Sequence, residues 1–164
     1  MQTINIEYLN PEKGSKILDL GCGQGRHCFG AYMHADVDVF GFDMSHLDVL
    51  KAQKNFKDFD ESSNNKSCSF GVTDGRKLPF KNNSFDYIIC SEVLEHIIDF
   101  ESVIEEIERV LKPGGHFLCL EFSNVELPPL RHLYDTYSFN VLPLLGEKIV
   151  GDRNSYQYLG LGTL

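Results

Sequence analysis

Short apolar runs alternate with helical patterns along the chain from Lys16 to about Phe122. Strands that alternate with helices favour βαβ units, in which the strands run parallel and the helices cover the sheet. We therefore predict an α/β fold whose parallel sheet has the strand order 3-2-1-4-5, because right-handed crossovers place the reversal of the strand order beside the first strand. The expected strands are residues 16–20, 37–42, 67–72, 85–90 and 116–122.

The clearest helical pattern follows the fourth expected strand. Its apolar residues recur at helical spacing, and they are Phe100, Val103, Ile104, Ile107 and Leu111. Asp99 is the expected N-cap, and residues 112–115, Lys-Pro-Gly-Gly, are the expected stop. Two earlier helices are expected to begin near Arg26 and after Ser45, because Ser45 and Asp48 have the spacing of a helix cap.

The composition suits one globular core. The chain has 164 residues, of which 42% are hydrophobic, and we expect residues 1–164 to form a single domain. Its net charge of −9 opposes binding to phosphate backbones, so we expect no nucleic-acid partner. No apolar run reaches the roughly 20 residues of a membrane-spanning helix, and residues 1–5 lack the pattern of a secretory signal. A cytoplasmic location is expected on these grounds.

The cysteines are odd in number and include no CxxC pair; they are Cys22, Cys28, Cys68, Cys90 and Cys119. Most of them fall inside apolar runs, which indicates buried free thiols in a reducing compartment. Cys22, His27 and Cys28 are close in sequence, but two further ligands at the spacing of a zinc site are absent. We expect no bound metal.

A glycine-rich turn separates the first expected strand from its helix. Gly21, Gly23 and Gly25 lack side chains, so backbone N–H groups there can approach a ligand closely. A dinucleotide-binding fingerprint would have its third glycine at position 26, where this chain has Arg26. The GxGxG spacing therefore disfavours a nicotinamide-dependent oxidoreductase.

Two acidic residues follow the next two expected strands. Asp43 ends the second strand, about 20 residues beyond the glycines, where a carboxylate can accept hydrogen bonds from both ribose hydroxyls. Asp74 follows the third strand, where it could accept a hydrogen bond from an adenine amino group. Either aspartate could instead be a helix cap or a turn residue.

Several segments in order resemble the motifs of class I S-adenosylmethionine-dependent methyltransferases. They are residues 17–25, 41–45, 74–80, 85–96 and 109–115, within about residues 15–122. The resemblance implies a Rossmann-like fold, S-adenosylmethionine as the cofactor, and an enzyme that transfers a methyl group to a small molecule. The C-terminal β-hairpin that completes this fold would be missing, so we expect a chain truncated at its C-terminus.

The same resemblance assigns the cofactor-binding residues. The methionine end would be held by Asp19 and by the turn residues Gly21, Cys22, Gly23 and Gly25. Asp43 would bind the ribose, and Met44 would cover one face of the adenine unless it is a packing residue. Asp74 and Gly75 would border the adenine amine. Ser91 and Glu92 would border the methyl group.

The tail of the chain is similar to the ubiquinone and menaquinone biosynthesis C-methyltransferases. The similarity lies in residues 120–123, 133–146 and 152–159. It implies a small aromatic acceptor, a prenylated quinol that is methylated on carbon. The negative charge of the chain opposes strong attraction to anionic lipid, so we expect at most transient contact with a membrane surface. Tyr134, Tyr137 and Phe139 would contact the acceptor, or else pack on the sheet as part of an amphipathic lid helix.

Methylation of a quinol carbon also needs a base for the phenolic proton. His96 and Glu95 are the candidate catalytic residues, because an imidazole ordinarily gains and loses a proton near physiological pH. They stand where the quinone family has an Arg and an Asn, so a methyltransferase for another small molecule is one alternative. A non-catalytic protein that binds S-adenosylmethionine is the other. The sequence predicts no oligomeric state.

Overall fold

The computed structural model describes residues 4, 6–59 and 66–120. The chain divides into two units, Met1–Glu121 and Phe122–Leu164, and all described residues belong to the first. Within that part, no helix has the length and apolar character needed to cross a membrane. The elements are η1 (Ile6–Leu9), β1 (Lys16–Leu20), α1 (Arg26–His34), β2 (Asp38–Asp43), α2 (His46–Phe59), β3 (Cys68–Val72), β4 (Phe85–Ser91), η2 (Leu94–His96), α3 (Phe100–Val110) and β5 (Leu111–Leu120).

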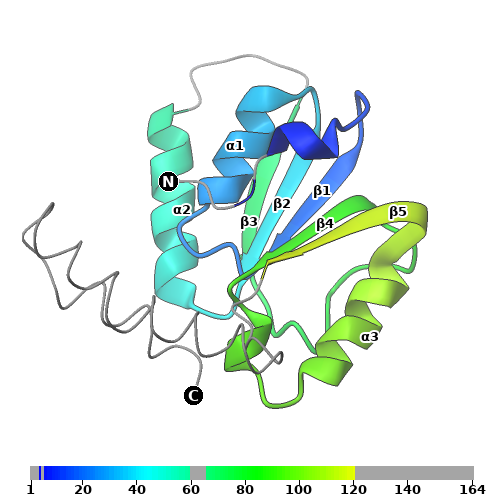
Figure 1. The fold of residues 1–164 in the computed structure, drawn as a ribbon. Helices are drawn as coiled ribbons and strands as arrows, with labels where there is room; N and C mark the ends of the chain where they lie inside the picture. Colours follow the sequence, from blue (N-terminus) through cyan, green and yellow to red (C-terminus); the bar gives the residue numbers. More distant parts are fainter. Residues whose placement is uncertain (1–3, 5, 60–65, 121–164) are drawn as a thin grey trace, which may run out of the picture. The chain divides into compact units, whose positions relative to one another are not determined.

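The strands form one parallel sheet in the order β3-β2-β1-β4-β5 (Figure 1). This confirms the predicted α/β fold and its strand order. β1 lies between β2 and β4, so that Leu20 pairs with Phe42 on one side and with Cys90 on the other. The strand order therefore reverses beside β1, and in folds of this class ligands bind at the carboxyl ends of the strands at that point.

Two apolar layers hold the sheet, because successive side chains of a strand point to opposite faces. Ile17 of β1 packs on one face with Cys28 of α1. Leu18, the next residue, packs on the other face with Val103 and Ile107 of α3. Figure 1 shows the corresponding layers, with α1 and α2 on one side of the sheet and α3 on the other. This packing fixes the loops that leave the strands at their carboxyl ends.

The predicted helix starts are correct, but only one predicted cap bond is formed. Oγ of Ser45 accepts a hydrogen bond from the backbone N–H of Asp48 at 3.3 Å and donates to the Asp48 carboxylate at 2.8 Å. Asp99 occupies the N-cap position of α3 but makes no side-chain bond to the helix backbone. Its carboxylate accepts a hydrogen bond from the hydroxyl of Ser102 at 2.9 Å instead.

The predicted start of β5 at residue 116 is wrong. The strand begins at Leu111. Leu111 pairs with Phe85, and the register then shifts so that Tyr87 pairs with His116. The rings of these two residues stack with their centroids 5.5 Å apart. Residues 112–115 bulge out of the ladder between these two pairs, and Nζ of Lys112 bonds to Oδ1 of Asp86 at 2.8 Å. The Lys-Pro-Gly-Gly segment ends the helix as predicted, but it also belongs to an irregular strand.

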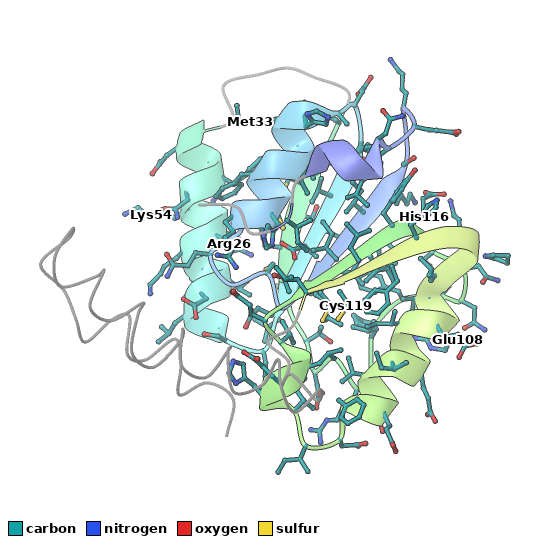
Figure 2. The ribbon with its side chains drawn as sticks, in the orientation of Figure 1. Arg26, Met33, Lys54, Glu108, His116 and Cys119 are labelled. Atoms are coloured by element: carbon teal, nitrogen blue, oxygen red, sulfur yellow. The ribbon has the colours of Figure 1, made fainter. Side chains whose placement is uncertain are left out.

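The cysteines follow the predicted burial with one exception. Cys22, Cys28 and Cys90 are buried and Cys68 is half-buried. Cys119 is exposed, which corrects the expectation of a buried thiol at this position. It lies on β5 (Figure 2), at the edge of the described sheet, where an apolar run does not guarantee burial.

Candidate functional site

The turn after β1 is held against the end of β2 by backbone hydrogen bonds. The N–H groups of Gly21 and Cys22 donate to the carbonyl of Phe42 at 2.7 and 3.1 Å. Gly21 has a φ of +74°, and a Cβ built on it would lie 2.1 Å from Cγ2 of Val93. Only glycine fits here, because the backbone conformation and the space both exclude a side chain. Gly23, with a φ of +52°, faces open space.

Asp43, at the end of β2, is fixed by the same turn. Its Oδ2 accepts a hydrogen bond from the backbone N–H of Gly23 at 2.8 Å, and its Oδ1 accepts one from that of Ser45 at 2.7 Å. A carboxylate oxygen has about two acceptor sites, so each oxygen keeps one for a ligand. The carboxylate is therefore oriented to accept hydrogen bonds from two neighbouring hydroxyl groups.

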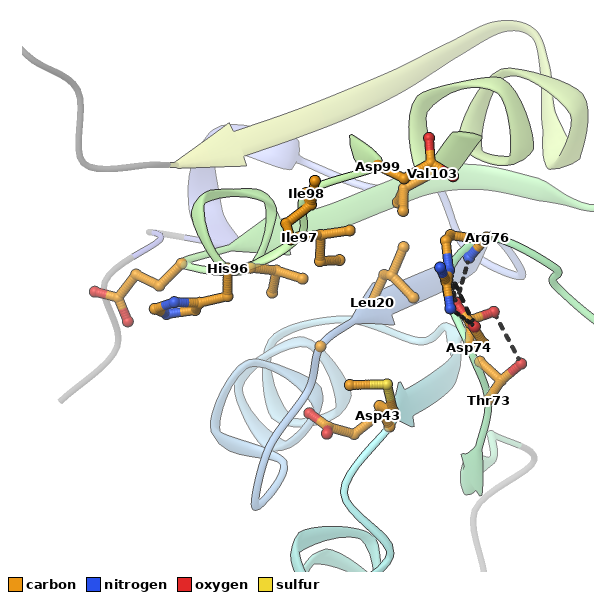
Figure 3. A pocket seen from close by; sticks show the side chains of 15 residues that line it. Leu20, Asp43, Thr73, Asp74, Arg76, His96, Ile97, Ile98, Asp99 and Val103 are labelled. Carbon is orange, nitrogen blue, oxygen red and sulfur yellow. Dashed lines mark hydrogen bonds and ion pairs between the residues drawn. The ribbon is translucent and has the colours of Figure 1, made fainter. Parts of the chain in front are cut away.

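A cavity of about 620 Å³, which we call the larger cavity, opens at the carboxyl ends of the central strands. Figure 3 shows Leu20, Ile97 and Val103 on its wall. The predicted cofactor residues that it brings together are Gly21, Asp43, Met44, Asp74, Gly75 and Glu92. The carboxyl ends of four strands, β1 to β4, therefore each contribute predicted residues to one cavity.

Met44 follows Asp43 directly and is 74% exposed. A core packing residue would be buried, so the alternative role for Met44 is not supported. Its side chain contributes to the wall of the larger cavity. An apolar thioether in this position can cover the face of a planar ring.

A second cavity, the smaller cavity, measures about 280 Å³. It is lined by the glycine turn, by the start of α1 and by the end of β4, where the predicted residues Ser91 and Glu92 lie. Gly21 and Glu92 line both cavities, so the two adjoin at these residues. Cys22 and Gly23, which were predicted to hold the methionine end of the cofactor, also line the smaller cavity.

An ion pair that the sequence analysis missed borders the smaller cavity. Nη2 of Arg26 lies 2.8 Å from Oε2 of Glu92 (Figure 2 labels Arg26). Glu92 has a φ of +60°, which is uncommon for a residue other than glycine, and its N–H donates to the carbonyl of Leu120 at 2.7 Å. Such backbone strain concentrates at functional sites. Arg26 stands directly after the glycine turn in the sequence, and this position is the signal that could have indicated a place in the site.

Asp19 lies behind the glycine turn, is 1% exposed and lines neither of the two cavities. Its Oδ2 accepts a hydrogen bond from the thiol of Cys28 at 3.2 Å, and its Oδ1 lies 3.9 Å from Nδ1 of His27. Burial raises the pKa of Asp19 to about 6 and lowers the pKa of His27 to about 4. This geometry supports a role for Asp19 beneath the turn, where the sequence analysis had expected contact with the ligand.

Gly25 likewise lines neither of these cavities. It has a φ of +88°, and a Cβ built on it would lie 3.0 Å from ring atoms of Phe29 and Phe70. Its backbone N–H donates to the carbonyl of Cys22 at 2.9 Å. The geometry therefore gives Gly25 a part in the turn and in packing, and not the ligand contact that was expected.

Asp74 follows β3 and lines the larger cavity, and its carboxylate forms an ion pair with Arg76 (Figure 3). Nε and Nη2 of Arg76 donate to Oδ1 and Oδ2 at 3.0 and 2.6 Å. These hydrogen bonds lower the pKa of Asp74 to about 2. Arg76 was not predicted, because a local sequence pattern does not show which way a long side chain turns.

The two candidate catalytic residues lie side by side, but only one reaches the larger cavity. His96 lies in η2 and lines that cavity (Figure 3). Its Nε2 is 3.5 Å from Oε1 of Glu95, which lines neither cavity. The three predicted acceptor-binding residues, Tyr134, Tyr137 and Phe139, lie outside the described residues.

The strand order, the glycine turn and the aspartate at the end of β2 together define the class I methyltransferase fold. Comparison with solved structures agrees. The chain is similar to an S-adenosylmethionine-dependent methyltransferase from Mesorhizobium loti, with 29% identity, a TM-score of 0.57 and coverage of 70% of this chain and 50% of that one. It is also similar to the 4+2 cyclase SpnF, with 27% identity, a TM-score of 0.68 and coverage of 75% and 44%.

The chain belongs to the ubiE/COQ5 methyltransferase family, whose family model matches residues 2–162. One relative is the ubiquinone/menaquinone biosynthesis C-methyltransferase UbiE of Bradyrhizobium sp. strain BTAi1, with 38% identity over 95% of this chain and 62% of the relative. This confirms the resemblance seen in the tail. The chain spans 58 to 62% of the length of the first curated relatives that it matches.

Proposed function

We propose that the chain binds S-adenosylmethionine, with the nucleoside in the larger cavity and the methionine end in the smaller one. The observation that carries this proposal is the carboxylate of Asp43, which two backbone N–H groups hold with one acceptor site left on each oxygen. A ribose diol offers two neighbouring donors that match these sites. Asp74 on the same cavity supplies an acceptor for the adenine amine, and Met44 supplies an apolar cover for the ring.

The charges around the smaller cavity suit an amino-acid group. Arg26 and Glu92 line it with opposite charges 2.8 Å apart, and the turn residues Cys22 and Gly23 line it as well. An α-carboxylate can bind the guanidinium, and an α-ammonium can bind the glutamate, so a zwitterion fits this cavity without adding net charge. Gly21 and Glu92 line both cavities, which supports one ligand that extends from one cavity into the other.

The reaction that we propose is transfer of the methyl group to a small aromatic acceptor, a prenylated quinol, at a ring carbon. S-adenosylmethionine supplies an activated methyl on a positive sulfur, so the protein mainly has to align the acceptor and exclude water. The substrate class is supported by family membership and by the name of the Bradyrhizobium relative. Contact of Tyr134, Tyr137 and Phe139 with the acceptor, transient membrane contact and a cytoplasmic location stay predictions.

His96 is the proposed general base. When a ring carbon forms its bond to the methyl group, the bond from that methyl to sulfur would break and S-adenosylhomocysteine would leave. The imidazole would accept the phenolic proton during this step. Loss of the ring C–H proton to solvent would then restore the aromatic ring as a phenolate, which would take its proton back from the imidazolium. Glu95, with Oε1 3.5 Å from Nε2 of His96, can orient the imidazole.

The test supplies the protein with S-adenosylmethionine that carries a labelled methyl group, and with either a demethylated prenyl quinol or unrelated phenols. We expect label on a ring carbon of the quinol and little on the phenols. Transfer to the phenols but none to the quinol would end the quinone assignment and leave a methyltransferase of another pathway. Binding of the cofactor without transfer to any acceptor would favour a non-catalytic role.

Removal of the Asp43 carboxylate should weaken binding of S-adenosylhomocysteine. We expect Asp43→Ala to raise the Kd by about tenfold or more, because a hydrogen bond to a charged group is worth roughly 1.5–3 kcal/mol. Calorimetry measures this change, and a thermal melt without ligand checks that the variant is folded. Asp58→Ala, an exposed aspartate on α2, is the matched control. An unchanged Kd in folded Asp43→Ala would contradict the ribose role.

A further inference from the structure

Arg76 carries the guanidinium on the described wall of the larger cavity, and its side chain turns back onto Asp74 (Figure 3). Its backbone N–H donates to Oδ1 of Asp74 at 2.9 Å, and Nε donates to Oδ1 at 3.0 Å and to Oδ2 at 3.1 Å. Nη2 donates to Oδ2 at 2.6 Å. If the shared Nε–H is assigned to the nearer oxygen, Oδ1 is filled and Oδ2 keeps one acceptor site.

An ion pair on a protein surface usually contributes little, and the two side chains here are 50% and 43% exposed. This pair differs from such a contact in two ways. The guanidinium binds both carboxylate oxygens, and the backbone N–H of Arg76 binds the same group, so the carboxylate has one orientation. A ligand that entered the cavity would also exclude water from the pair.

The turn that carries Asp74 has a fixed position relative to Asp43. The backbone N–H of Thr73 donates to the carbonyl of Asp43 at 3.0 Å, and that of Lys77 donates to the carbonyl of Asp74 at 3.0 Å. The two aspartates are therefore joined through the backbone at the ends of neighbouring strands. A ligand held by Asp43 would meet Asp74 at one defined position.

We propose that Arg76 is a positioning residue that makes Asp74 selective for the 6-amino group of an adenine base. The inference rests on the proposed function and adds a specificity role to it. The single acceptor site left on Oδ2 matches one N–H donor. A base with an oxygen at this position offers a second acceptor, which the carboxylate repels. Without Arg76, the Asp74 side chain can rotate and be hydrated, so it distinguishes the two bases less well.

The test compares S-adenosylhomocysteine with S-inosylhomocysteine, which carries a 6-oxo group in place of the 6-amino group. Calorimetry gives the ratio of the two Kd values for the unaltered protein, for Arg76→Met, for Asp74→Asn and for the double variant. The unaltered protein should prefer the adenine ligand, and each single change should lower that preference by roughly tenfold. The double variant should lose no more than Asp74→Asn alone, because Arg76 acts through Asp74.

The ratio is formed within each variant, so a loss of folded protein affects both ligands equally. Arg76→Lys should give an intermediate ratio of Kd values, because a lysine keeps the positive charge but lacks the planar guanidinium that binds both carboxylate oxygens. Lys77→Met, an exposed neighbouring cation that does not line the cavity, should keep the original ratio. The assignment would be overturned if Arg76→Met had the same ratio of Kd values as the unaltered protein. It would also be overturned if Arg76→Met changed this ratio equally in the unaltered protein and in Asp74→Asn. Binding of neither ligand by the unaltered protein would overturn the proposed function with it.

Discussion

The free energy of unfolding of the Asp19→Asn variant is expected to increase as the pH rises from about 4 to 6.5. That of the unaltered protein should change little over the same range. Two buried groups oppose each other in this range. Asp19 has its pKa raised by burial from 3.8 to about 6, so its contribution to stability is present below pH 3.8 and is lost as the pH rises to about 6. This loss amounts to about 3 kcal/mol.

His27 acts in the opposite sense. Its pKa is lowered by burial from 6.5 to about 4, so the folded protein releases a proton that the unfolded chain keeps, and stability rises from about pH 4 to 6.5. This gain is also about 3 kcal/mol, so the two effects largely cancel in the unaltered protein. Asp19→Asn removes only the carboxylate and leaves an oxygen that can accept the hydrogen bond of the Cys28 thiol.

Urea unfolding at several pH values between 4 and 7 measures the effect. The free energy of unfolding of Asp19→Asn should increase across this range, and that of His27→Gln should decrease. Asp58→Asn, at an exposed position on α2, serves as the control and should follow the unaltered protein. Parallel profiles for Asp19→Asn and the unaltered protein would mean that Asp19 titrates normally in the fold.

The sequence predicted the strand order because that order depends on a pattern that is visible along the chain. Apolar runs of strand length alternated with helical spacing, and the handedness of the crossovers then left one arrangement. The start of β5 could not be predicted in this way. Leu111 continues the helical spacing of α3, and only its pairing with Phe85 makes it a strand residue.

The candidate site was predictable where a residue's role follows from its place at the end of a strand. Asp43 is the last residue of β2, Met44 follows it, and Asp74 comes shortly after β3, and all three line the larger cavity. The partners of these residues were not predictable, because they depend on contacts far apart in sequence. Arg26 and Glu92 are 66 positions apart, and the positive φ of Glu92 has no signal in its residue type.

Gly21→Ala is expected to lower the free energy of unfolding by about 2–5 kcal/mol, through two causes that can be separated. An alanine with a positive φ is strained by roughly 1–2 kcal/mol, and Gly21 has a φ of +74°. The added Cβ would also lie 2.1 Å from Cγ2 of Val93. Overpacking of this kind typically costs about 1–3 kcal/mol, because the backbone or the neighbouring side chain has to move.

Gly14→Ala separates the two causes, since Gly14 has a φ of +80° but no atom within 4 Å of a built Cβ. It should show the strain alone, about 1–2 kcal/mol by urea unfolding. Val93→Ala removes the side-chain atom that a Cβ on residue 21 would strike. Val93→Ala should therefore lower the free energy of unfolding less in the Gly21→Ala variant than in the unaltered protein. A double-mutant cycle measures this coupling. Equal losses for Gly21→Ala and Gly14→Ala would show that the turn relaxes without contact with Val93.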